Sequence, residues 1–375
     1  MMYFFVIIGL LYTVLLLKLI FSFDKAPNFE THLTAENSPV PFSVLIPFRN
    51  EAENLESLVT SINQLNYIYS NFEVIFINDD SNDDSVKIIK KHISSAIDFS
   101  VIENVCVTNS GKKDAISLGI SKAKFDWIIT TDADCILPKE SLSQYSNFAM
   151  NQDITMICGP VLIESDGSFL EMYQQIDGLS LQAVTISSFG FGNPLLCNGA
   201  NIAYKKAAFK AVNGFTGNDH IASGDDVFLL QKMKDKFPNG VHFLKSWGAI
   251  VRTKPVQSWK KLINQRVRWA SKTSELKELA AKAMGWIVFL TNLSLLVGAV
   301  FSFYETQNFL YFLIFLSIKL VLDFWLLSKS LLFFKLKPNL VYIVLCSFLY
   351  PFITTIVVLK SINGGYIWKG RSLKK

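Results

Sequence analysis

Long apolar stretches near both ends of the chain are the feature that most constrains its fold. Across residues 2–20 the only charge is Lys18, and about 20 apolar residues in a helix cross the ~30 Å hydrocarbon core of a bilayer. A cleaved signal peptide fits less well, because no basic residue precedes the run, the run is too long and no small-x-small cleavage motif follows. The sequence therefore predicts a retained transmembrane anchor over residues 1–22.

Three more apolar segments lie near the carboxyl end, over residues 286–303, 309–327 and 340–359. The hydrophobic content of 50% and the mean hydropathy of +0.31 are high for a soluble protein. We predict a carboxyl-terminal transmembrane cluster of two or three spans over residues 285–360, followed by a basic tail over 361–375. Pro351 leaves two alternatives for the last segment, a full crossing or a re-entrant hairpin.

Basic residues predict which side of the membrane each loop faces. Residues 304–308 contain no Lys or Arg, whereas the connection after the second carboxyl-terminal segment carries Lys329, Lys335 and Lys337. Lys18 and Lys25 likewise lie at the carboxyl side of the first anchor. Because cytoplasmic loops are enriched in Lys and Arg, we expect an integral membrane protein whose long polar middle is cytosolic.

Charge and cysteine content restrict the partners. The net charge is only +5, and basic residues gather near the membrane segments without interleaved aromatic residues, so a lipid bilayer with anionic headgroups is the expected partner and nucleic acid is not. The five cysteines lack the paired spacing of zinc or disulfide sites, which fits a reducing compartment.

The middle of the chain alternates strand and helix patterns. Short apolar runs at 42–47 and 72–77 flank a helical pattern at 53–65. The same alternation continues further on, with helical patterns at 84–97 and 112–123, a strand at 101–107 and a strand ending at Thr131. This order predicts an α/β domain with a mostly parallel, Rossmann-like sheet. We place it at residues 42–255, after a linker over 23–41.

Carboxylates follow two of the predicted strands. Asp79 comes after the second strand, and Asp132 and Asp134 come after the strand that ends at Thr131. Parallel strands bring their carboxyl ends to one edge of the sheet, where α/β proteins bind ligands, and paired carboxylates are ligands for hard divalent cations. The alternative readings are a solvated turn for Asp132 and Asp134, and a helix cap for the acidic residues that follow Asp79.

Two further motifs belong to the same predicted edge. The first strand ends in a segment that holds Pro47, Arg49 and Glu51. Gly111-Lys112 opens a helix, where free amide groups and a lysine are suited to an anionic ligand. A solvated helix start is the alternative for this second motif.

In their order along the chain these motifs resemble the membrane-bound glycosyltransferases of family two, whose nucleotide-sugar-binding fold is called GT-A. The resemblance rests on residues 43–47 with Asn50-Glu51, the Asp79 motif, Gly111-Lys112, Asp132-Ala133-Asp134, Gly224-Asp225-Asp226 and residues 265–269, which read Gln-Arg-Val-Arg-Trp. It covers most of the predicted cytosolic part. The layout is similar to that of ceramide glucosyltransferases, and processive polysaccharide synthases share the last motif.

The resemblance implies roles for these residues. It implies that a UDP-sugar is bound by Pro47, Arg49, Glu51, Asp79, Lys112 and Asp132. It implies that Asp134 ligates Mg²⁺ or Mn²⁺ at the diphosphate, that Asp226 is the catalytic base, and that Gln265, Arg268 and Trp269 lie near the diphosphate and the acceptor. The sequence departs from the family pattern at Gly224-Asp225-Asp226, where Thr-Glu-Asp is usual, and we favour Asp226 over Asp225 because an apolar run follows it.

The resemblance implies an inverting, metal-dependent transfer of a sugar from a UDP-sugar to a membrane lipid at the cytosolic face. A processive or oligomerising polysaccharide synthase is an alternative, and an inactive nucleotide-sugar sensor or membrane scaffold is an alternative of another class. Residues 256–284 are expected to form a basic amphipathic segment on the headgroups as well. Within the spans, Lys319 and Asp323 are four residues apart, so they are expected to pair on one helix face, and they could also line a site for a lipid headgroup.

Overall fold

The computed structural model of the 375-residue chain describes residues 2–29, 39–108, 110–150, 153–218, 221, 223–275, 278–363, 366–368 and 371–373. The chain divides into two compact units. One, called here the sheet unit, comprises Pro27–Glu164 and Leu196–Lys254. The other, the helical unit, comprises Met1–Ala26, Ser165–Leu195 and Pro255–Lys375.

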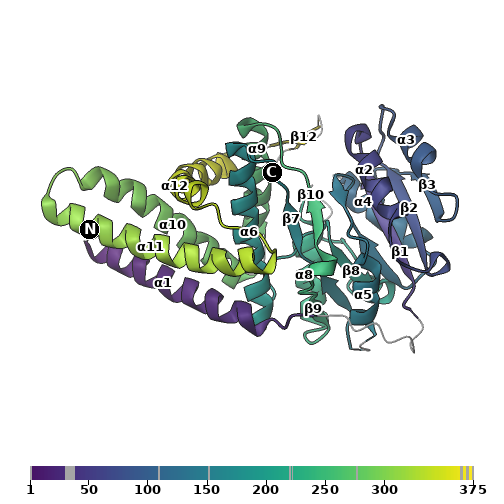
Figure 1. Cartoon of the computed structure of the whole chain (residues 1–375), viewed down its shortest axis with the longest axis horizontal. Helices are drawn as coiled ribbons and strands as arrows, with labels where there is room; N and C mark the ends of the chain where they lie inside the picture. The colour runs from purple at the N-terminus through teal and green to yellow at the C-terminus, as the bar shows by residue number, and fades with distance from the viewer. Residues whose placement is uncertain are drawn as a thin grey trace. The chain divides into compact units, whose positions relative to one another are not determined.

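A seven-stranded sheet forms the centre of the sheet unit, with the strand order β3-β2-β1-β4-β8-β6-β9 (Figure 1). Its strands are β1 (Phe42–Phe48), β2 (Phe72–Asn78), β3 (Asp98–Glu103), β4 (Trp127–Thr130), β6 (Met156–Cys158), β8 (Ile202–Lys205) and β9 (Val241–Phe243). The first four are mutually parallel, β8 runs antiparallel to both of its neighbours, and β9 is parallel to β6. The predicted fold class, a mostly parallel α/β sheet, is confirmed.

A smaller sheet and a set of α-helices complete the described part of this unit. The smaller sheet has the order β5-β10-β7, formed by β5 (Cys135–Ile136), β10 (Val251–Thr253) and β7 (Val161–Ile163). The α-helices are α2 (Ala52–Asn63), α3 (Ser85–His92), α4 (Gly111–Lys122), α5 (Ser141–Ala149), α7 (Lys206–Ala211) and α8 (Asp225–Lys236). Strand β2 is buried at every position, which explains its mainly apolar sequence, and the carboxylate of its one charged residue, Glu73, accepts from the Ser43 hydroxyl at 2.6 Å.

The edge strand β3 begins and ends earlier than predicted. It pairs with β2 from Asp98 to Glu103, whereas the sequence pattern favoured residues 101–107. Val105 and Val107 are 71% and 82% exposed, so their apolar character does not reflect a place in the sheet. Pairing with β2 determines where this strand begins and ends. The prediction was shifted because the alternation of apolar and polar residues continues past Glu103.

The described residues of the helical unit form six α-helices. They are α1 (Met2–Lys25), α6 (Phe169–Gly190), α9 (Trp259–Ser271), α10 (Leu279–Phe301), α11 (Thr306–Phe333) and α12 (Leu340–Asn363), followed by the short strands β11 (Tyr366–Trp368) and β12 (Arg371–Leu373). Among the residues that the structure describes, four segments are long and apolar enough to cross a membrane, namely Phe5–Lys25, Leu279–Phe301, Thr306–Phe333 and Leu340–Ile362. The anchor and the carboxyl-terminal cluster that the sequence predicted correspond to these four helices.

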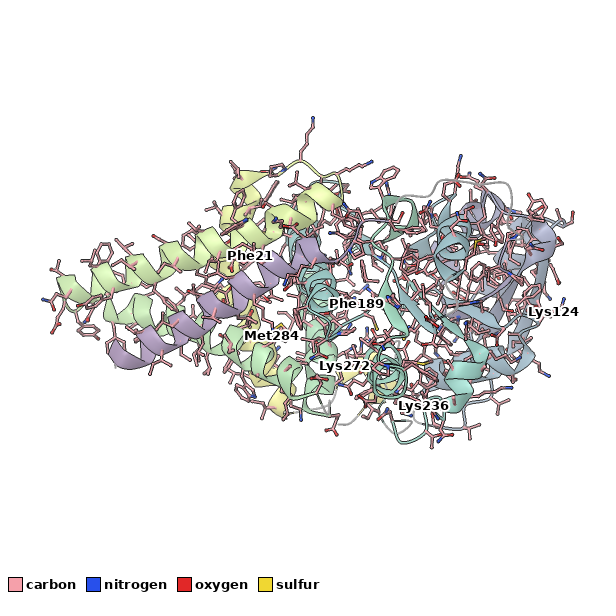
Figure 2. All side chains as sticks on the ribbon, turned by 90° about the horizontal axis from the view of Figure 1, so that it is seen from below. Phe21, Lys124, Phe189, Lys236, Lys272 and Met284 are labelled. Atoms are coloured by element: carbon pink, nitrogen blue, oxygen red, sulfur yellow. The ribbon has the colours of Figure 1, made fainter. Side chains whose placement is uncertain are left out.

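Apolar side chains face outward from the membrane helices (Figure 2). Phe21 of α1 packs edge-on against Trp325 of α11, with 6.0 Å between ring centroids, and the two side chains are still 59% and 41% exposed. Outward apolar residues of this kind are expected where the surrounding medium is lipid.

Helix α12 settles the alternatives for the last apolar segment. It continues through Pro351 to residue 363, so the re-entrant hairpin is wrong. Proline removes one backbone hydrogen bond from a helix, and a membrane helix tolerates this loss when neighbouring helices and polar side chains surround it.

Helix α6 changes the predicted domain boundaries. Residues 165–195 belong to the helical unit and interrupt the stretch of 42–255 that the sequence analysis assigned to one domain. Gly190 lies against the backbone of α1, where an added Cβ would approach the carbonyl oxygen of Ser22 to 1.8 Å. Of the predicted linker over 23–41, residues 30–38 lie outside the described residues, as do 364–365, 369–370 and 374–375 of the predicted tail.

Candidate functional site

The strand register brings the predicted polar residues to one edge of the large sheet. Phe48 is paired with Asn78 and Leu45 with Thr130. The amide of Asp79 donates to the carbonyl of Phe48, and that of Thr131 donates to the carbonyl of Leu45. The segments that follow β1, β2 and β4 therefore begin side by side, as expected for the carboxyl ends of parallel strands.

Asp79 is buried and is held by groups that the sequence analysis did not identify. Its Oδ1 accepts hydrogen bonds from Asn104 Nδ2 at 2.9 Å and from the Cys106 thiol at 3.1 Å. An added Cβ at Gly111 would lie 2.5 Å from Asp79 Oδ2, so this close approach requires glycine. The amide of Asn104 donates to the carbonyl of Asn78, and this bond brings Asn104 and Cys106 to Asp79. No local sequence pattern predicts this bond.

The segment after β1 adds a cation beside Asp79. Arg49 Nη1 donates to the Asp79 carbonyl at 2.6 Å and lies 3.1 Å from the Asp80 carboxylate. Glu51 immediately precedes α2, where its carboxylate accepts from Asn54 Nδ2 at 2.8 Å. Pro47 is part of β1 itself, in register with Ile77. These residues share the polar edge that the sequence predicted.

Lys112 connects the end of β4 to the start of α8. Its Nζ lies 2.7 Å from Asp132 Oδ1 and 3.0 Å from Asp225 Oδ2, and its side chain is 22% exposed. Burial acts to lower the pKa of Lys112, but the negative charges of Asp132, Asp225 and Asp226 outweigh it and hold the pKa above its ordinary value. The ammonium group therefore stays charged and compensates the acidic cluster.

Asp225 and Asp226 begin α8 after Gly224, whose φ of 81° lies in the left-handed region that glycine tolerates. Asp226 Oδ2 accepts from the amide of Gly199 at 3.4 Å, whereas Asp225 carries the contact with Lys112. An added Cβ at Gly199 would lie 2.9 Å from Asp225 Oδ2. The loop over residues 198–201 therefore contacts both the end of β4 and the start of α8. Asp225 and Asp226 both lie beside this loop.

A second lysine, which the sequence analysis did not assign, fixes the approach to α8. Lys113 is 1% exposed, and its Nζ donates to the carbonyls of Asn218 at 2.5 Å and Ile221 at 2.7 Å. Its ammonium also lies 5.4 Å from the centroid of the Phe228 ring. Lys113 therefore anchors the segment before α8, while the adjacent Lys112 serves the acidic cluster.

The donor set at β4 is compatible with a divalent cation that also binds phosphate. Asp132 and Asp134 are partly buried on either side of the buried Ala133. Burial, together with the charges of Asp134 and Asp132, raises the pKa of the Cys135 thiol and keeps it protonated. Within the described residues, no group of three His, Cys, Asp or Glu side chains is arranged to hold a metal. Mg²⁺ commonly binds through one or two carboxylates plus substrate phosphates, and this pair fits that mode.

The Gln-Arg-Val-Arg-Trp motif lies on α9 of the helical unit. Arg266 is buried, its Nε donates to Asp177 of α6 at 2.6 Å, and its Nη1 donates to Gln265 Oε1 at 2.7 Å. The guanidinium carbon lies 4.2 Å from the centroid of the Trp269 ring. Arg266, to which the sequence analysis gave no role, therefore contacts two of the three predicted residues, whereas Arg268 is not part of these contacts.

Helix α9 is anchored by an apolar cluster as well as by this ion pair. Leu262 and Val267 pack with Tyr173 of α6 and with residues of α12. The Ser258 hydroxyl caps the helix by accepting from the amide of Lys261 at 3.3 Å. The motif thus has a rigid support within the helical unit.

The mostly parallel sheet with its acidic carboxyl edge defines a GT-A-type fold, the fold of many glycosyltransferases. A solved mannosyltransferase from Pyrobaculum calidifontis, in complex with GDP-Man and Mn²⁺, superimposes with a TM-score of 0.56 over 87% of this chain and 94% of its own, at 14% sequence identity.

Residues 43–212 match the family model described as glycosyl transferase family 2, so this part of the chain is similar to that family of glycosyltransferases. Similar curated proteins are poly-beta-1,6-N-acetyl-D-glucosamine synthases. That of Staphylococcus aureus is 26% identical over 266 residues, or 70% of this chain, and that of Staphylococcus epidermidis is 26% identical over 217 residues, or 56% of this chain. The matched regions span 61% and 50% of the lengths of these two relatives.

Proposed function

We propose that this membrane protein transfers a sugar from a UDP-sugar to a membrane lipid at the cytosolic face, with inversion at the anomeric carbon. The observation that carries the proposal is the contact of Lys112 with both Asp132 and Asp225. This lysine connects Asp132, which is expected to bind the donor, with the start of α8, which is expected to supply the base. The match of residues 43–212 to the model of glycosyl transferase family 2 supports the reaction class.

The donor half of the proposal uses the sheet edge. Asp79 is rigidly held and suits hydrogen bonds to the uracil or ribose, while Arg49 adds positive charge beside it. Asp132 faces the nucleotide and Asp134 is the proposed ligand of Mg²⁺ or Mn²⁺. A bound divalent cation would neutralise the charge that develops on the departing diphosphate. The Mn²⁺ in the solved mannosyltransferase supports this cofactor class.

The acceptor half needs a base. We assign this role to Asp226, whose carboxylate at the start of α8 would accept the proton of the attacking hydroxyl, a contribution of about 10²–10⁴-fold in rate. With one base and no separate nucleophile, direct displacement inverts the anomeric centre. Gln265, Arg268 and Trp269 are proposed to contact the diphosphate and the acceptor, and Arg268 would add charge-assisted hydrogen bonds.

A lipid acceptor is favoured by the small number of membrane helices. Four candidate spans are found among the described residues, which is few for a channel that carries a polymer. Lys25 and Lys329 lie at the same end of the neighbouring helices α1 and α11, where Lys329 pairs with Asp24, and the positive-inside rule assigns this end to the cytosol.

A growing polysaccharide is the second candidate acceptor, because the curated relatives are named as synthases of poly-beta-1,6-N-acetyl-D-glucosamine. In that case this chain would need to oligomerise or recruit a partner channel. The inactive-sensor alternative is disfavoured because Asp226, Gln265, Arg268 and Trp269 are all present.

One assay separates these candidates. Purified protein in nanodiscs that contain a bacterial lipid extract is incubated with Mn²⁺ and a panel of radiolabelled UDP-sugars. Label that partitions into organic solvent supports a lipid acceptor, label in an insoluble polymer supports the synthase, and no transfer with any donor would contradict both. EDTA should abolish the transfer.

The same assay tests the base. Asp226→Asn is compared with Asp225→Asn, its neighbour on α8. We expect the first to reduce turnover about 10²–10⁴-fold, whereas loss of Asp225 removes a contact of Lys112 without removing the base. Full activity of the Asp226→Asn variant would refute this assignment.

A further inference from the structure

The membrane helices border a cavity that has no role in the proposed transfer. It has a volume of about 320 Å³ and lies between the amino-terminal half of α1, the carboxyl-terminal part of α10 and the amino-terminal half of α11. These helices lie side by side (Figure 1). Most of the wall is apolar, and includes Phe5, Leu10, Gly298, Phe312 and Phe315. A cavity of this size is within the range of small-molecule sites.

The cavity is accessible from the outer surface of the helices. Its lining residues Leu10, Ile314 and Tyr311 are 60%, 50% and 49% exposed, so the wall is continuous with the apolar exterior. All three helices are candidate spans. The medium that reaches this opening is therefore the hydrocarbon of the bilayer, and the available apolar ligand is a lipid chain.

The length of the cavity matches one leaflet. On α11 its lining residues extend from Asn308 to Lys319, which corresponds to roughly 16 Å at a rise of 1.5 Å per residue. Half of a typical hydrocarbon core is about 15 Å. Asn308 lies two residues after the start of α11 and Lys319 near its middle, so the cavity extends from the membrane interface to the midplane.

Lys319 and Tyr12 line the inner end of the cavity, and both contact Asp323 behind it. Lys319 is 3% exposed and its Nζ lies 2.5 Å from Asp323 Oδ2, while the Tyr12 hydroxyl donates to the same carboxylate. The ammonium also lies 5.8 Å from the ring centroids of Tyr12 and Tyr350. Because the buried charge is already compensated, this end does not require an ionic ligand.

We infer that this cavity binds one acyl chain of a phospholipid from the leaflet that contains the amino-terminal half of α1. The proposed orientation makes this the leaflet opposite the cytosol, because Lys18 and Lys25 lie at the other end of α1. The lipid is therefore a ligand separate from the acceptor. Its binding does not depend on the proposed transfer reaction, so the two are tested independently.

Photocrosslinking tests the site directly. The full chain is reconstituted into phosphatidylcholine nanodiscs with a trace of phosphatidylcholine that carries a diazirine at the end of one acyl chain. After irradiation, labelled peptides are identified by mass spectrometry. We expect label on the peptides of α1, α10 and α11 that line the cavity, above the level on other exposed faces of the same helices.

Two pairs of variants decide whether the label reports the cavity. Leu10→Trp fills the opening and is matched by Val14→Trp, at a 65% exposed position of α1 outside the cavity. Gly298→Leu fills the wall and is matched by Gly285→Leu on α10, where an added Cβ meets nothing within 4 Å. Exclusion of two chain methylenes alone would lower occupancy about tenfold.

The expected result is a roughly tenfold loss of cavity label in the two filling variants and wild-type label in the two matched controls. Equal labelling in wild type and all variants would show ordinary annular lipid only and overturn the inference. If Gly298→Leu fails to fold, the Leu10→Trp and Val14→Trp pair decides alone, because both positions are exposed.

Discussion

Replacement of Lys112 by Met is the most direct test of the acidic cluster. Methionine keeps most of the length of the side chain but removes the cation that contacts Asp132 and Asp225 at 2.7 and 3.0 Å. Removal of one partner from a fully buried ion pair costs about 3–5 kcal/mol. The side chains of Lys112, Asp132 and Asp225 are 22%, 35% and 14% exposed, so solvent screening reduces the expected loss to about 2 kcal/mol.

Thermal unfolding with and without Mn²⁺ measures this effect. For a domain of about 150–250 residues, 2 kcal/mol corresponds to a decrease in Tm of about 4–8 °C in metal-free buffer. In the wild type a cation bound at Asp134 lies beside the Lys112 ammonium group, which already neutralises Asp132 and repels a second positive charge. In the variant this repulsion is absent. Mn²⁺ should therefore raise the Tm of Lys112→Met more than that of the wild type. The difference should grow with the ratio of the Mn²⁺ concentration to the Kd of the site.

Lys124→Met is the matched control. Lys124 forms an ion pair with Asp98 at an exposed position of the same unit (Figure 2), and its loss should leave Tm and the Mn²⁺ response unchanged. The reasoning is refuted if Lys112→Met has wild-type stability without metal, or if Mn²⁺ stabilises variant and wild type equally.

Three further variants test other parts of the structure. Gly111→Ala places a Cβ 2.5 Å from Asp79 Oδ2, and displacement of this carboxylate should weaken UDP binding about 10–100-fold in calorimetry. Arg266→Met leaves Asp177 buried without its cation and should destabilise the helical unit by about 3–5 kcal/mol in detergent unfolding. Burial acts to raise the pKa of Asp83, but hydrogen bonds from neighbouring hydroxyl and amide groups lower it below its usual value. Asp83→Asn should therefore be less stable than wild type at pH 6, and the gap should close as the pH falls below about 4.

Each of these three expectations has a contrary result. Unchanged UDP affinity in Gly111→Ala would show that Asp79 does not contact the nucleotide. A wild-type unfolding midpoint for Arg266→Met would mean that the buried pair does not hold α9 against α6. A stability gap for Asp83→Asn that is constant between pH 6 and pH 3 would exclude ionisation of Asp83 as its source.

The sequence by itself determined the membrane helices and the first half of the sheet. An apolar helix long enough to cross a bilayer and a buried strand such as β2 are both specified by the composition of one continuous segment. The alternation of strand and helix also fixes which strand ends share an edge, so the meeting of Asp79, Asp132 and the segment after β1 was predictable.

The tertiary structure alone decided which groups hold these residues. Lys112 pairs with Asp225 from α8, Asp79 is supported by Asn104 and Cys106, and Arg266 pairs with Asp177, which is 89 residues away. A charge on one segment has no local preference among distant partners, and its partner is selected only when burial brings the two side chains together. The same holds for α6, which belongs to the helical unit because its surface packs against α1 and α11. The sequence of α6 alone does not predict which helices it packs against.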